Sequence, residues 1–435
     1  MSFHESYLQK RRTPHDAVAL IEDYTKVHFS GEPVTLLEEL REQKGRFRGL
    51  FLYTMLGLKS QEAHRSLLTM ELEGHISYGV CFFGKGEADA VKNGRTIEYI
   101  TSHFSQFEDI VERQLKPGYL LANVAPMDDE GYFSLGYAPN GRAAADAGAR
   151  VILQVNRLMP AVCSDYYKVH IDEVDALCES DTPIAEFPDP EPTETDRIVA
   201  GHIAGRIQNG ATIQLGYGSL PSAIGLCLMD FKDLGVHTEV FTNTMTMLMK
   251  HGAVNNSKKK LYPGLSVTGF CQGTKETYDF LDNNKNVLNK KLSWVNDPEV
   301  IAMNNDMVSI NSCMSVDLRG QVCSESLGFN TSGGSGGQLD FVRGARKAPG
   351  GKSYIAMHSV ARMKNGDRIS KITLSLSPGS VVTVPRNDVH FIVTEYGVAE
   401  MADCSTRAKA LNLISIAHPD FRDQLHFEAK KNNII

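Results

Sequence analysis

Four glycines lie in the eleven-residue segment Gly334-Ser335-Gly336-Gly337-Gln338-Leu339-Asp340-Phe341-Val342-Arg343-Gly344. Glycine has no Cβ atom, so the backbone can approach a ligand closely and can also turn with a positive φ angle. Consecutive main-chain N–H groups in such a turn form a concave site that attracts anions. We therefore expect Gly334, Gly336 and Gly337 to offer N–H groups to a bound oxygen or phosphate group.

A second glycine-containing turn has the sequence Gly216-Tyr217-Gly218-Ser219-Leu220-Pro221. It follows a strand expected over residues 212–215 and precedes a helix expected over 221–229, with Pro221 suited to the first helical turn. The free N–H groups of a helix start favour a phosphate or acyl group there. The turn lacks the third glycine of the dinucleotide motif and the lysine of a P-loop, and a plain strand-to-helix connection remains the alternative.

Two glutamates are candidates for chemistry. Glu239 interrupts the apolar, strand-like segment 235–241, and a carboxylate is costly to bury unless it is paired or used. It is a candidate nucleophile or base, although His237 and Glu239 share one strand face and could both point to water. Glu325, in Ser324-Glu325-Ser326, is the second candidate because it lies close in sequence to the 334–344 segment. Spacing does not choose between them.

Other polar groups have ordinary explanations beside the chemical ones. Asn296 follows the only tryptophan, Trp294, and its amide could donate to a substrate carbonyl. The sequence Asn-Asp-Pro is also an ordinary turn or helix start. The run Lys258-Lys259-Lys260 could neutralise phosphates, but consecutive lysines point in different directions, so we expect a solvated surface.

These residues must be positioned by alternating strands and helices. Strands are expected at 151–155, 212–215, 307–312, 381–384 and 391–394, a hairpin at 317–322, and helices at 140–148 and 221–229. This alternation predicts an α/β fold with two open domains of similar topology. Ligands of such sheets bind beyond the carboxyl ends of the strands, so we expect the active site in the cleft between the domains.

The domain boundary is expected within residues 179–196, which contain four prolines and seven acidic residues. Such a composition sustains neither a helix nor a central strand. It predicts an N-terminal domain over 1–185 and a C-terminal domain over 186–435, with a helix beginning near 194–196.

Composition excludes several classes of function. At 435 residues the chain is long enough for about two domains. The 45 basic and 52 acidic residues leave a net charge of −7, which argues against nucleic-acid binding. The eight cysteines show neither C-x-x-C pairs nor zinc spacing, so we expect reduced thiols and no metal. Without an apolar signal core or a run of about 20 apolar residues, we expect a cytoplasmic protein that does not enter membranes.

Seven segments, in order between residues 215 and 422, closely resemble the acetyl-CoA hydrolase/transferase family, and weaker counterparts at 123–134 and 155–160 extend the resemblance over nearly the whole chain. The seven segments are LGYGSLPSAIG, HTEVFT, VNDPEV, MVSINSCMSVDLRGQVCSESLG, SGGSGGQLDFVRGA, RNDVHFIVTEYGVA and LISIAHPDFR. These proteins are class I CoA-transferases, and the most similar subgroup is that of the 4-hydroxybutyrate and butyrate:acetate CoA-transferases.

The resemblance implies roles for particular residues. Glu239 would be the catalytic glutamate, Gly336 and Gly337 would supply oxyanion N–H groups, and Asn296 would be an active-site asparagine. The residues implied to line the coenzyme A site are Gly216, Tyr217, Gly218, Ser219, Leu220, Met314, Gly334 and Gly337.

The resemblance also implies the reaction. Coenzyme A would pass between a short-chain acyl-CoA and a carboxylate, such as 4-hydroxybutyrate or butyrate with acetate, through a glutamyl-CoA thioester. Coenzyme A and small carboxylates would be substrates, no cofactor would be bound permanently, and the protein would be a homodimer or a larger homo-oligomer. An acetyl-CoA hydrolase using the same glutamate and an inactive CoA-binding protein are the alternatives. Ser315 and the pair Ser332-Gly333 depart from the subgroup's pattern, which leaves the acyl substrate less defined than the reaction.

Overall fold

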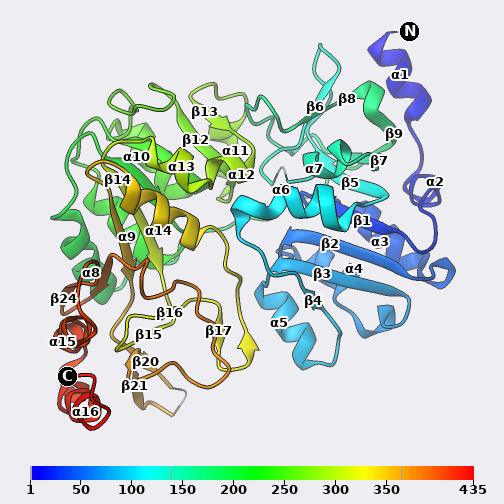
Figure 1. Ribbon diagram of the computed structural model, residues 1–435. Coiled ribbons are helices and arrows are strands. Elements are labelled where there is room, and N and C mark those ends of the chain that lie inside the picture. Colours follow the sequence, from blue (N-terminus) through cyan, green and yellow to red (C-terminus); the bar gives the residue numbers. More distant parts are fainter. Residues whose placement is uncertain (1, 139, 364) are drawn as a thin grey trace. The chain divides into compact units, whose positions relative to one another are not determined.

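The computed structural model describes residues 2–138, 140–363 and 365–435 and contains two compact units (Figure 1). The first unit comprises Met1–Phe187 and Thr268–Ser293, and the second comprises Pro188–Val267 and Trp294–Ile435. The division near residue 187 lies close to the expected boundary. It also assigns 268–293 to the first unit, whereas the sequence placed these residues in the C-terminal domain.

A seven-stranded sheet forms the centre of the first unit, with the strand order β4-β3-β2-β1-β5-β7-β9. Every neighbouring pair in this sheet is parallel. Strand β5 is buried along its whole length, as expected when helices cover both faces of a parallel sheet. The strands are β1 (Lys26–Ser30), β2 (Leu50–Leu56), β3 (Ile76–Phe82), β4 (Glu98–Tyr99), β5 (Tyr119–Val124), β7 (Arg150–Val155) and β9 (Val174–Glu179).

Helices and short strands complete the first unit. The helices are α1 (Phe3–Lys10), α2 (Pro14–Val18), α3 (Val34–Glu42), α4 (Gln61–Leu67), α5 (Lys85–Lys92), α6 (Phe107–Ile110), α7 (Arg142–Asp146) and α11 (Lys275–Leu281). Single helical turns are η1 (Lys44–Arg46), η2 (Met70–Leu72), η3 (Phe104–Gln106), η4 (Val111–Leu115) and η5 (Ile171–Glu173). The remaining strands are β6 (Tyr132–Ser134), β8 (Lys168–His170) and β13 (Val287–Asn289).

The second large sheet has the order β13-β12-β11-β10-β14-β19-β23-β24. Its first seven strands repeat the sequential pattern of the other sheet, which confirms the expected similarity in topology. Strand β10 pairs in parallel with β11 and β14, and β24 closes the edge antiparallel to β23. The strands are β10 (Thr212–Leu215), β11 (Gly235–Phe241), β12 (Ser266–Cys271), β14 (Met307–Ser312), β19 (Lys352–Ala356), β23 (Phe391–Thr394) and β24 (Gly397–Glu400).

Helices and small hairpins complete the second unit. The helices are α8 (Glu194–Ala204), α9 (Ser219–Cys227), α10 (Asn243–His251), α12 (Leu292–Val295), α13 (Pro298–Ala302), α14 (Gln338–Lys347), α15 (Thr406–Ile416) and α16 (Pro419–Lys431). The short strands are β15 (Ser315–Asp317), β16 (Val322–Cys323), β17 (Ser326–Leu327), β18 (Asn330–Thr331), β20 (Val360–Arg362), β21 (Arg368–Ser370) and β22 (Ile372–Thr373).

Most of the expected elements are present, and two need correction. The segment 381–384 is not a strand, because Val381 and Val382 are 45% and 40% exposed and only Val384 bridges, to Val322. Pro385, which lacks a backbone N–H donor, follows directly. The helix expected over 140–148 is confined to α7, because Gly148 takes φ +88° after it. The hairpin expected at 317–322 is confirmed by the antiparallel pairing of β15 and β16.

Residues 180–193, all of them described, form neither helix nor strand, as their prolines predicted. Side chains of each unit hold the middle of this connection, on either side of the division near residue 187. In the first unit, the Tyr278 hydroxyl donates to the Ala185 carbonyl at 3.0 Å. In the second unit, the Tyr217 hydroxyl donates to the Pro188 carbonyl at 2.8 Å. Tyr217 therefore has a contact beyond its own glycine-containing turn.

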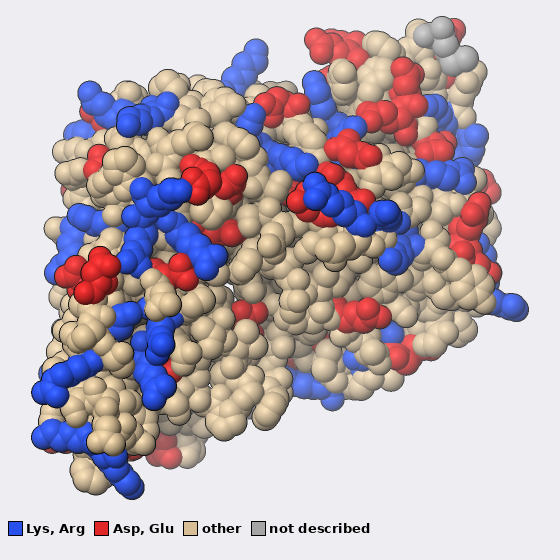
Figure 2. Space-filling view, viewed as in Figure 1, with Lys and Arg blue, Asp and Glu red and all other residues tan. Residues whose placement is uncertain are grey.

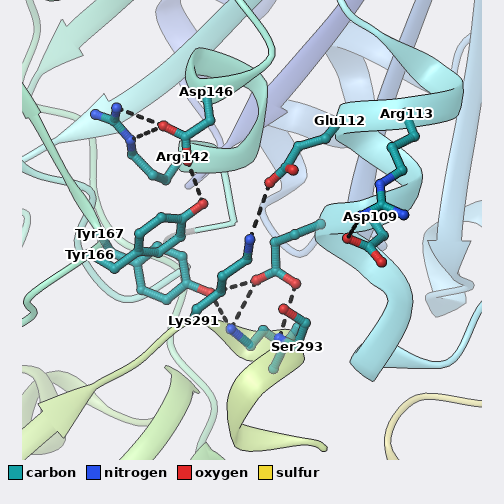
Figure 3. A network of polar contacts seen from close by, with 11 residues as sticks. Asp109, Glu112, Arg113, Arg142, Asp146, Tyr166, Tyr167, Lys291 and Ser293 are labelled. Atoms are coloured by element: carbon teal, nitrogen blue, oxygen red, sulfur yellow. Dashed lines mark hydrogen bonds and ion pairs between the residues drawn. The ribbon is translucent and has the colours of Figure 1, made fainter.

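Polar contacts within the first unit hold the end of the 268–293 segment (Figure 3). The buried carboxylate of Glu108 accepts hydrogen bonds from the Leu292 and Ser293 N–H groups at 2.9 and 3.0 Å. The Tyr167 hydroxyl donates to the same carboxylate at 3.1 Å. Lys291 pairs with Glu112 at 3.2 Å. These bonds satisfy a buried carboxylate with partners from a distant part of the sequence.

Several general features concern only the described residues. On the face shown in Figure 2, acidic and basic side chains are interspersed over broad uncharged areas. The eight cysteines all lie in the described part of the chain and are free thiols there. No described helix combines the length and apolar character needed to cross a membrane. Within the described ranges there is also no group of three or more His, Cys, Asp or Glu side chains that could hold a metal ion.

Candidate active site

The carboxyl ends of three neighbouring strands organise the candidate site in the second unit. Strand β10 lies between β11 and β14, and both pairings are parallel. The carboxyl ends of parallel strands meet at one edge of a sheet, where α/β proteins bind ligands. The turn starting at Gly216 follows β10, Glu239 lies near the end of β11, and Met314 follows β14.

Glu239, Asn296 and Gly337 come together at this edge. The Asn296 Nδ2 group donates to Glu239 Oε2 at 2.7 Å, and the Gly337 N–H also donates to this carboxylate. A Cβ atom built on Gly337 would lie 1.9 Å from Asn296 Nδ2 and 2.0 Å from Glu239 Oε2. The glycine is therefore required by close approach, although its φ of −100° is open to any residue.

The electrostatics of Glu239 favour a carboxyl group that titrates near neutrality. Burial raises the pKa of Glu239 to about 7, the hydrogen bonds from Asn296 and Gly337 oppose that rise, and the nearby Asp340 carboxylate adds to it. A partly buried carboxylate that titrates near neutral pH is a frequent feature of catalytic sites. Asp340, in the first turn of α14, is a neighbour that the sequence did not single out.

The alternative of a water-facing strand surface at His237 and Glu239 is wrong. His237 is fully buried, and Glu239 contacts Asn296 and Gly337. The expectation of a fully solvated lysine run is also wrong. Lys259 is 2% exposed and donates to the Val236 and Leu265 carbonyls at 2.8 and 2.6 Å, and burial lowers its pKa to about 7. Lysine residues on either side of it are exposed.

The turn after β10 has the conformation that its glycines suggested. Gly218 takes φ +128° and caps helix α9, and its carbonyl accepts from the Ser222 hydroxyl at 2.9 Å. Leu220 is buried, whereas Gly216, Tyr217 and Ser219 retain exposure to solvent. Open space surrounds the position of a Cβ on Gly216. The turn therefore leaves main-chain groups accessible at a helix start.

Asp189, which the sequence did not identify, lies beside this turn. Its carboxylate accepts a hydrogen bond from the Asn243 side chain and lies against the Ser222 hydroxyl, whose proton is donated to the Gly218 carbonyl; burial raises the pKa of Asp189. The proline-rich composition of residues 179–196 indicated a linker and gave no signal that one of its acids would contact α9 and α10.

The 334–344 segment is tied to its surroundings by Glu325. This glutamate is 3% exposed, and its carboxylate accepts from the Thr383 hydroxyl at 2.9 Å and from the Ser335 hydroxyl at 3.3 Å. Gly336 takes φ +53°, as a turn before helix α14 requires, and Gly334 is buried. Glu325 thus supports the loop, while Glu239 is the carboxylate that its Gly337 N–H contacts.

Met314 lies at the same end of the loop. Its sulfur is 3.6 Å from the Ser332 hydroxyl, and its N–H donates to the Cys323 carbonyl at 2.9 Å. The Gln338 amide donates to the Ser312 carbonyl at the end of β14 at 3.2 Å. The loop and the end of β14 are therefore joined by side-chain contacts.

This arrangement can support acyl transfer. It combines a partly exposed carboxylate, an amide donor and a main-chain N–H donor at one point, next to a helix start with accessible main-chain groups. Donors fixed beside a nucleophilic carboxylate can also hold the oxyanion that forms when it attacks a carbonyl carbon.

Known proteins resemble this chain along its whole length. Residues 1–188 match the acetyl-CoA hydrolase/transferase N-terminal domain, and residues 273–429 match the C-terminal domain of that family. The 4-hydroxybutyrate coenzyme A transferase of Clostridium kluyveri is 38% identical over 436 residues, which cover 99% of this chain and 100% of the relative. The butyryl-CoA:acetate CoA-transferase of Anaerostipes caccae is 33% identical over 453 residues, with 100% and 99% covered.

A solved structure shares both the fold and the length. The crystal structure of RipA from Yersinia pestis has a TM-score of 0.94 and 34% sequence identity, and the match covers 100% of both chains. From these matches we conclude that the chain belongs to the acetyl-CoA hydrolase/transferase family and is an enzyme of the CoA-transferase family.

Proposed function

We propose that this enzyme moves coenzyme A between a short-chain acyl-CoA and a carboxylate, with Glu239 as the covalent nucleophile. One observation carries the proposal. The Glu239 carboxylate contacts the Asn296 amide and the Gly337 N–H, yet burial raises its pKa to about 7. A carboxylate of that pKa is more basic than an exposed one and is still largely ionised slightly above neutral pH.

The reaction begins when a Glu239 oxygen attacks the thioester carbonyl and forms a tetrahedral oxyanion. Collapse breaks the C–S bond, which releases the CoA thiolate and leaves a glutamyl-acyl anhydride. The thiolate then attacks the glutamyl carbonyl, and cleavage of the anhydride C–O bond gives a glutamyl-CoA thioester and the first free carboxylate. A second carboxylate reverses these steps and leaves as its own CoA thioester.

Gly336 and Gly337 supply main-chain donors for the oxyanions in this scheme, and Asn296 orients Glu239. Removing one donor of this kind typically raises the barrier by roughly 2.7–4 kcal/mol. Glu325 is not the nucleophile in this scheme, because its carboxylate holds Thr383 and Ser335.

The remaining predicted residues would bind the coenzyme A part of the substrate. Gly216, Gly218 and Ser219 offer main-chain groups at the start of α9, where a phosphate or acyl oxygen is favoured. Tyr217, Leu220, Met314 and Gly334 would contribute the adjoining surface. Binding energy from this remote part of the substrate can be used to position the reacting thioester.

We propose 4-hydroxybutyrate or butyrate, exchanged with acetate, as the acyl groups. The support is the name of the two transferases that are 38% and 33% identical to this chain. Ser315, the first residue of β15, and Ser332, beside Met314, are the positions where the acyl preference could differ from theirs.

Trapping the intermediate tests the nucleophile. The enzyme is incubated with butyryl-CoA, reduced with borohydride, digested and analysed by peptide mass spectrometry. Reduction of a glutamyl-CoA thioester releases CoA and leaves an alcohol that has lost one oxygen and gained two hydrogens relative to glutamate. We expect this change at Glu239 alone. A change at Glu325, or an unmodified peptide at both positions, would contradict the proposal.

Hydrolysis by the same glutamate is the second candidate, because the matching family includes acetyl-CoA hydrolases. Acyl-CoA is incubated with and without added acetate, and both free CoA and acetyl-CoA are measured. A transferase forms acetyl-CoA only with acetate and releases little free CoA without it. Release of CoA at the full rate in the absence of an acceptor would favour the hydrolase.

A further inference from the structure

His237 is a buried ring between two segments of the candidate site. It has 0% exposure and lies on β11, two residues before Glu239. Its ring centroid is 6.0 Å from that of Trp294 and 6.2 Å from that of Phe341. Trp294 lies two residues before Asn296, and Phe341 lies on α14, which Gly337 caps. His237 therefore packs against both segments whose donors contact Glu239.

The hydrogen bond of His237 fixes its protonation. Its Nε2 atom is 2.8 Å from the Val295 carbonyl oxygen. A carbonyl oxygen can only accept, so Nε2 carries the proton and donates. Burial and the nearby Lys259 lower the pKa of His237 to about 3, so the ring is neutral with its single proton on Nε2. The Val295 carbonyl thus has a fixed donor over the ordinary pH range.

Val295 and Asn296 are both bound by side chains on one face of strand β11. Successive side chains of a strand alternate, so His237 and Glu239 point to the same side of β11. His237 binds the Val295 carbonyl, and Glu239 accepts from the Asn296 side chain. His237 is the donor in the first bond, and Glu239 is the acceptor in the second. Two neighbouring residues, Val295 and Asn296, are thus bound by two side chains on the same side of β11.

We infer that His237 is a positioning residue, whose Nε2–H bond to the Val295 carbonyl sets the place from which the Asn296 amide reaches Glu239. This inference rests on the proposed role of Glu239 as the nucleophile. The ring touches no reacting atom and acts through Asn296. The charged groups that face this region from other elements are Lys259, near His237, and Asp340, near Glu239.

The test compares variants that separate the hydrogen bond from the filling of space. H237F keeps an aromatic ring but has no donor. H237Q can place its amide N–H near the position of Nε2, whereas the shorter amide of H237N cannot reach as far. Displacement of a catalytic group by about 1 Å can cost roughly 100-fold in rate.

We expect kcat for acyl-CoA and acetate to fall ~10- to 100-fold in H237F and H237N, with KM for acyl-CoA within about twofold of wild type. H237Q should retain most of the activity. Because the Asn296 bond lowers the pKa of Glu239, its loss should also move the acidic limb of the kcat profile to higher pH in H237F. The same kcat in H237F, H237N and H237Q would overturn the inference. A rise in KM for acyl-CoA without a fall in kcat would also overturn it.

A double variant tests whether His237 acts through Asn296. If it does, H237F combined with N296A should have the kcat of N296A alone, because the second change removes the group that the first one misplaces. Losses that multiply would contradict this route. The pair H237Q and H237N provides the same comparison if H237F does not fold.

A buried histidine in the first unit provides the matched control. His28 is also 0% exposed, lies on β1, and packs against Tyr53 and Phe107 at centroid distances of 4.8 and 5.9 Å. H28F should keep wild-type kcat and the wild-type acidic limb, even if its thermal midpoint falls as much as that of H237F. A fall in kcat in H28F as large as that in H237F would assign the effect to general destabilisation.

Trapping separates the failure of this inference from that of the proposed function. If borohydride labels Glu239 in the wild type but H237F is fully active, only the positioning role fails. If Glu239 is not labelled in the wild type, the nucleophile assignment fails as well, whatever the activity of H237F.

Discussion

Glu239 is held in a position that is unfavourable for a charged carboxylate. Burial raises its pKa to about 7, although two hydrogen bonds act in the other direction. Each pKa unit corresponds to about 1.36 kcal/mol of difference between the protonation states. Ionisation of Glu239 therefore destabilises the folded enzyme. The ionised form is nevertheless the one that attacks the thioester in the proposed reaction.

Replacing Glu239 with glutamine should make this cost measurable. The folded-state pKa is above the unfolded value, so the wild type binds an extra proton when folded and loses stability as pH rises from about 4.5 to above 7. E239Q remains neutral and avoids this loss. We expect the free energy of unfolding of E239Q, measured with urea, to exceed that of the wild type by at most about 3 kcal/mol at pH 8. Near pH 4.5 the two free energies should be equal. A stability difference that does not change with pH would contradict the raised pKa.

The activity of the wild type should follow the same ionisation. Since only the carboxylate form of Glu239 attacks, we expect kcat to rise with pH through a limb near pH 7 and then level off. N296A removes a hydrogen bond that lowers this pKa, so its limb should lie at higher pH. Rate profiles between pH 5 and pH 9 check both statements, and a limb near the usual value of about 4.3 for glutamate would contradict them.

Gly337 should not tolerate even one methyl group. In G337A the added Cβ would overlap Asn296 Nδ2 and Glu239 Oε2, at 1.9 and 2.0 Å, so the pair must separate. We expect kcat to fall about 100- to 1,000-fold, as for loss of an oxyanion donor. Circular dichroism should show an intact fold. G205A is the control, because the nearest atom to its Cβ, the Gly201 carbonyl oxygen, is 3.4 Å away, and it should keep wild-type kcat.

At the scale of elements, local sequence explains where strands and helices begin. Segments 235–241 and 307–312 have strand-like patterns and are bounded by loops, and they form β11 and β14 with those limits. Helix α8 begins at a capping box in which Thr193 Oγ1 accepts from the Asp196 N–H at 3.1 Å and Asp196 accepts from the Thr193 N–H at 2.9 Å. Such signals act within a few residues.

Two changes in α8 should shift stability in opposite directions. T193A removes the cap and should lower the free energy of unfolding by about 1 kcal/mol. G201A lies on the exposed surface of the same helix with open space around its Cβ, and should raise that free energy by roughly 0.5–1 kcal/mol. Urea unfolding measures both. Destabilisation by G201A would mean that helix propensity does not limit stability here.

At the scale of the whole molecule, the first unit is built from two separate parts of the chain. Residues 268–293 belong to it, although they follow much of the second unit in sequence. The Gly273 carbonyl accepts from the Phe187 N–H at 3.0 Å, and the Cys271 N–H donates to the Tyr137 carbonyl at 2.8 Å. The N-terminal part lacks these partners when it is made alone, and the carboxylate of Glu108 then has no Leu292 or Ser293 N–H.

Splitting the chain between residues 187 and 188 should therefore give halves that depend on one another. We expect residues 1–187 to be poorly soluble when expressed alone, because a buried carboxylate without its donors is strongly destabilising. Coexpressed with 188–435, they should elute together from a gel-filtration column and recover transferase activity. A stable, monomeric 1–187 fragment would contradict this dependence.

The sequence by itself determined the α/β class, the limits of β11 and β14, the connection over 180–193 and the glycines that approach the site. These depend on apolar patterning, proline content and the missing Cβ of glycine, which act over a few residues. Only the tertiary structure decided that the Gly337 N–H contacts Glu239 and not Glu325, that Lys259 and His237 are buried, and that 268–293 belongs to the first unit. Those outcomes depend on which distant segments pack together, and the burial that raises the pKa of Glu239 exists only once they do.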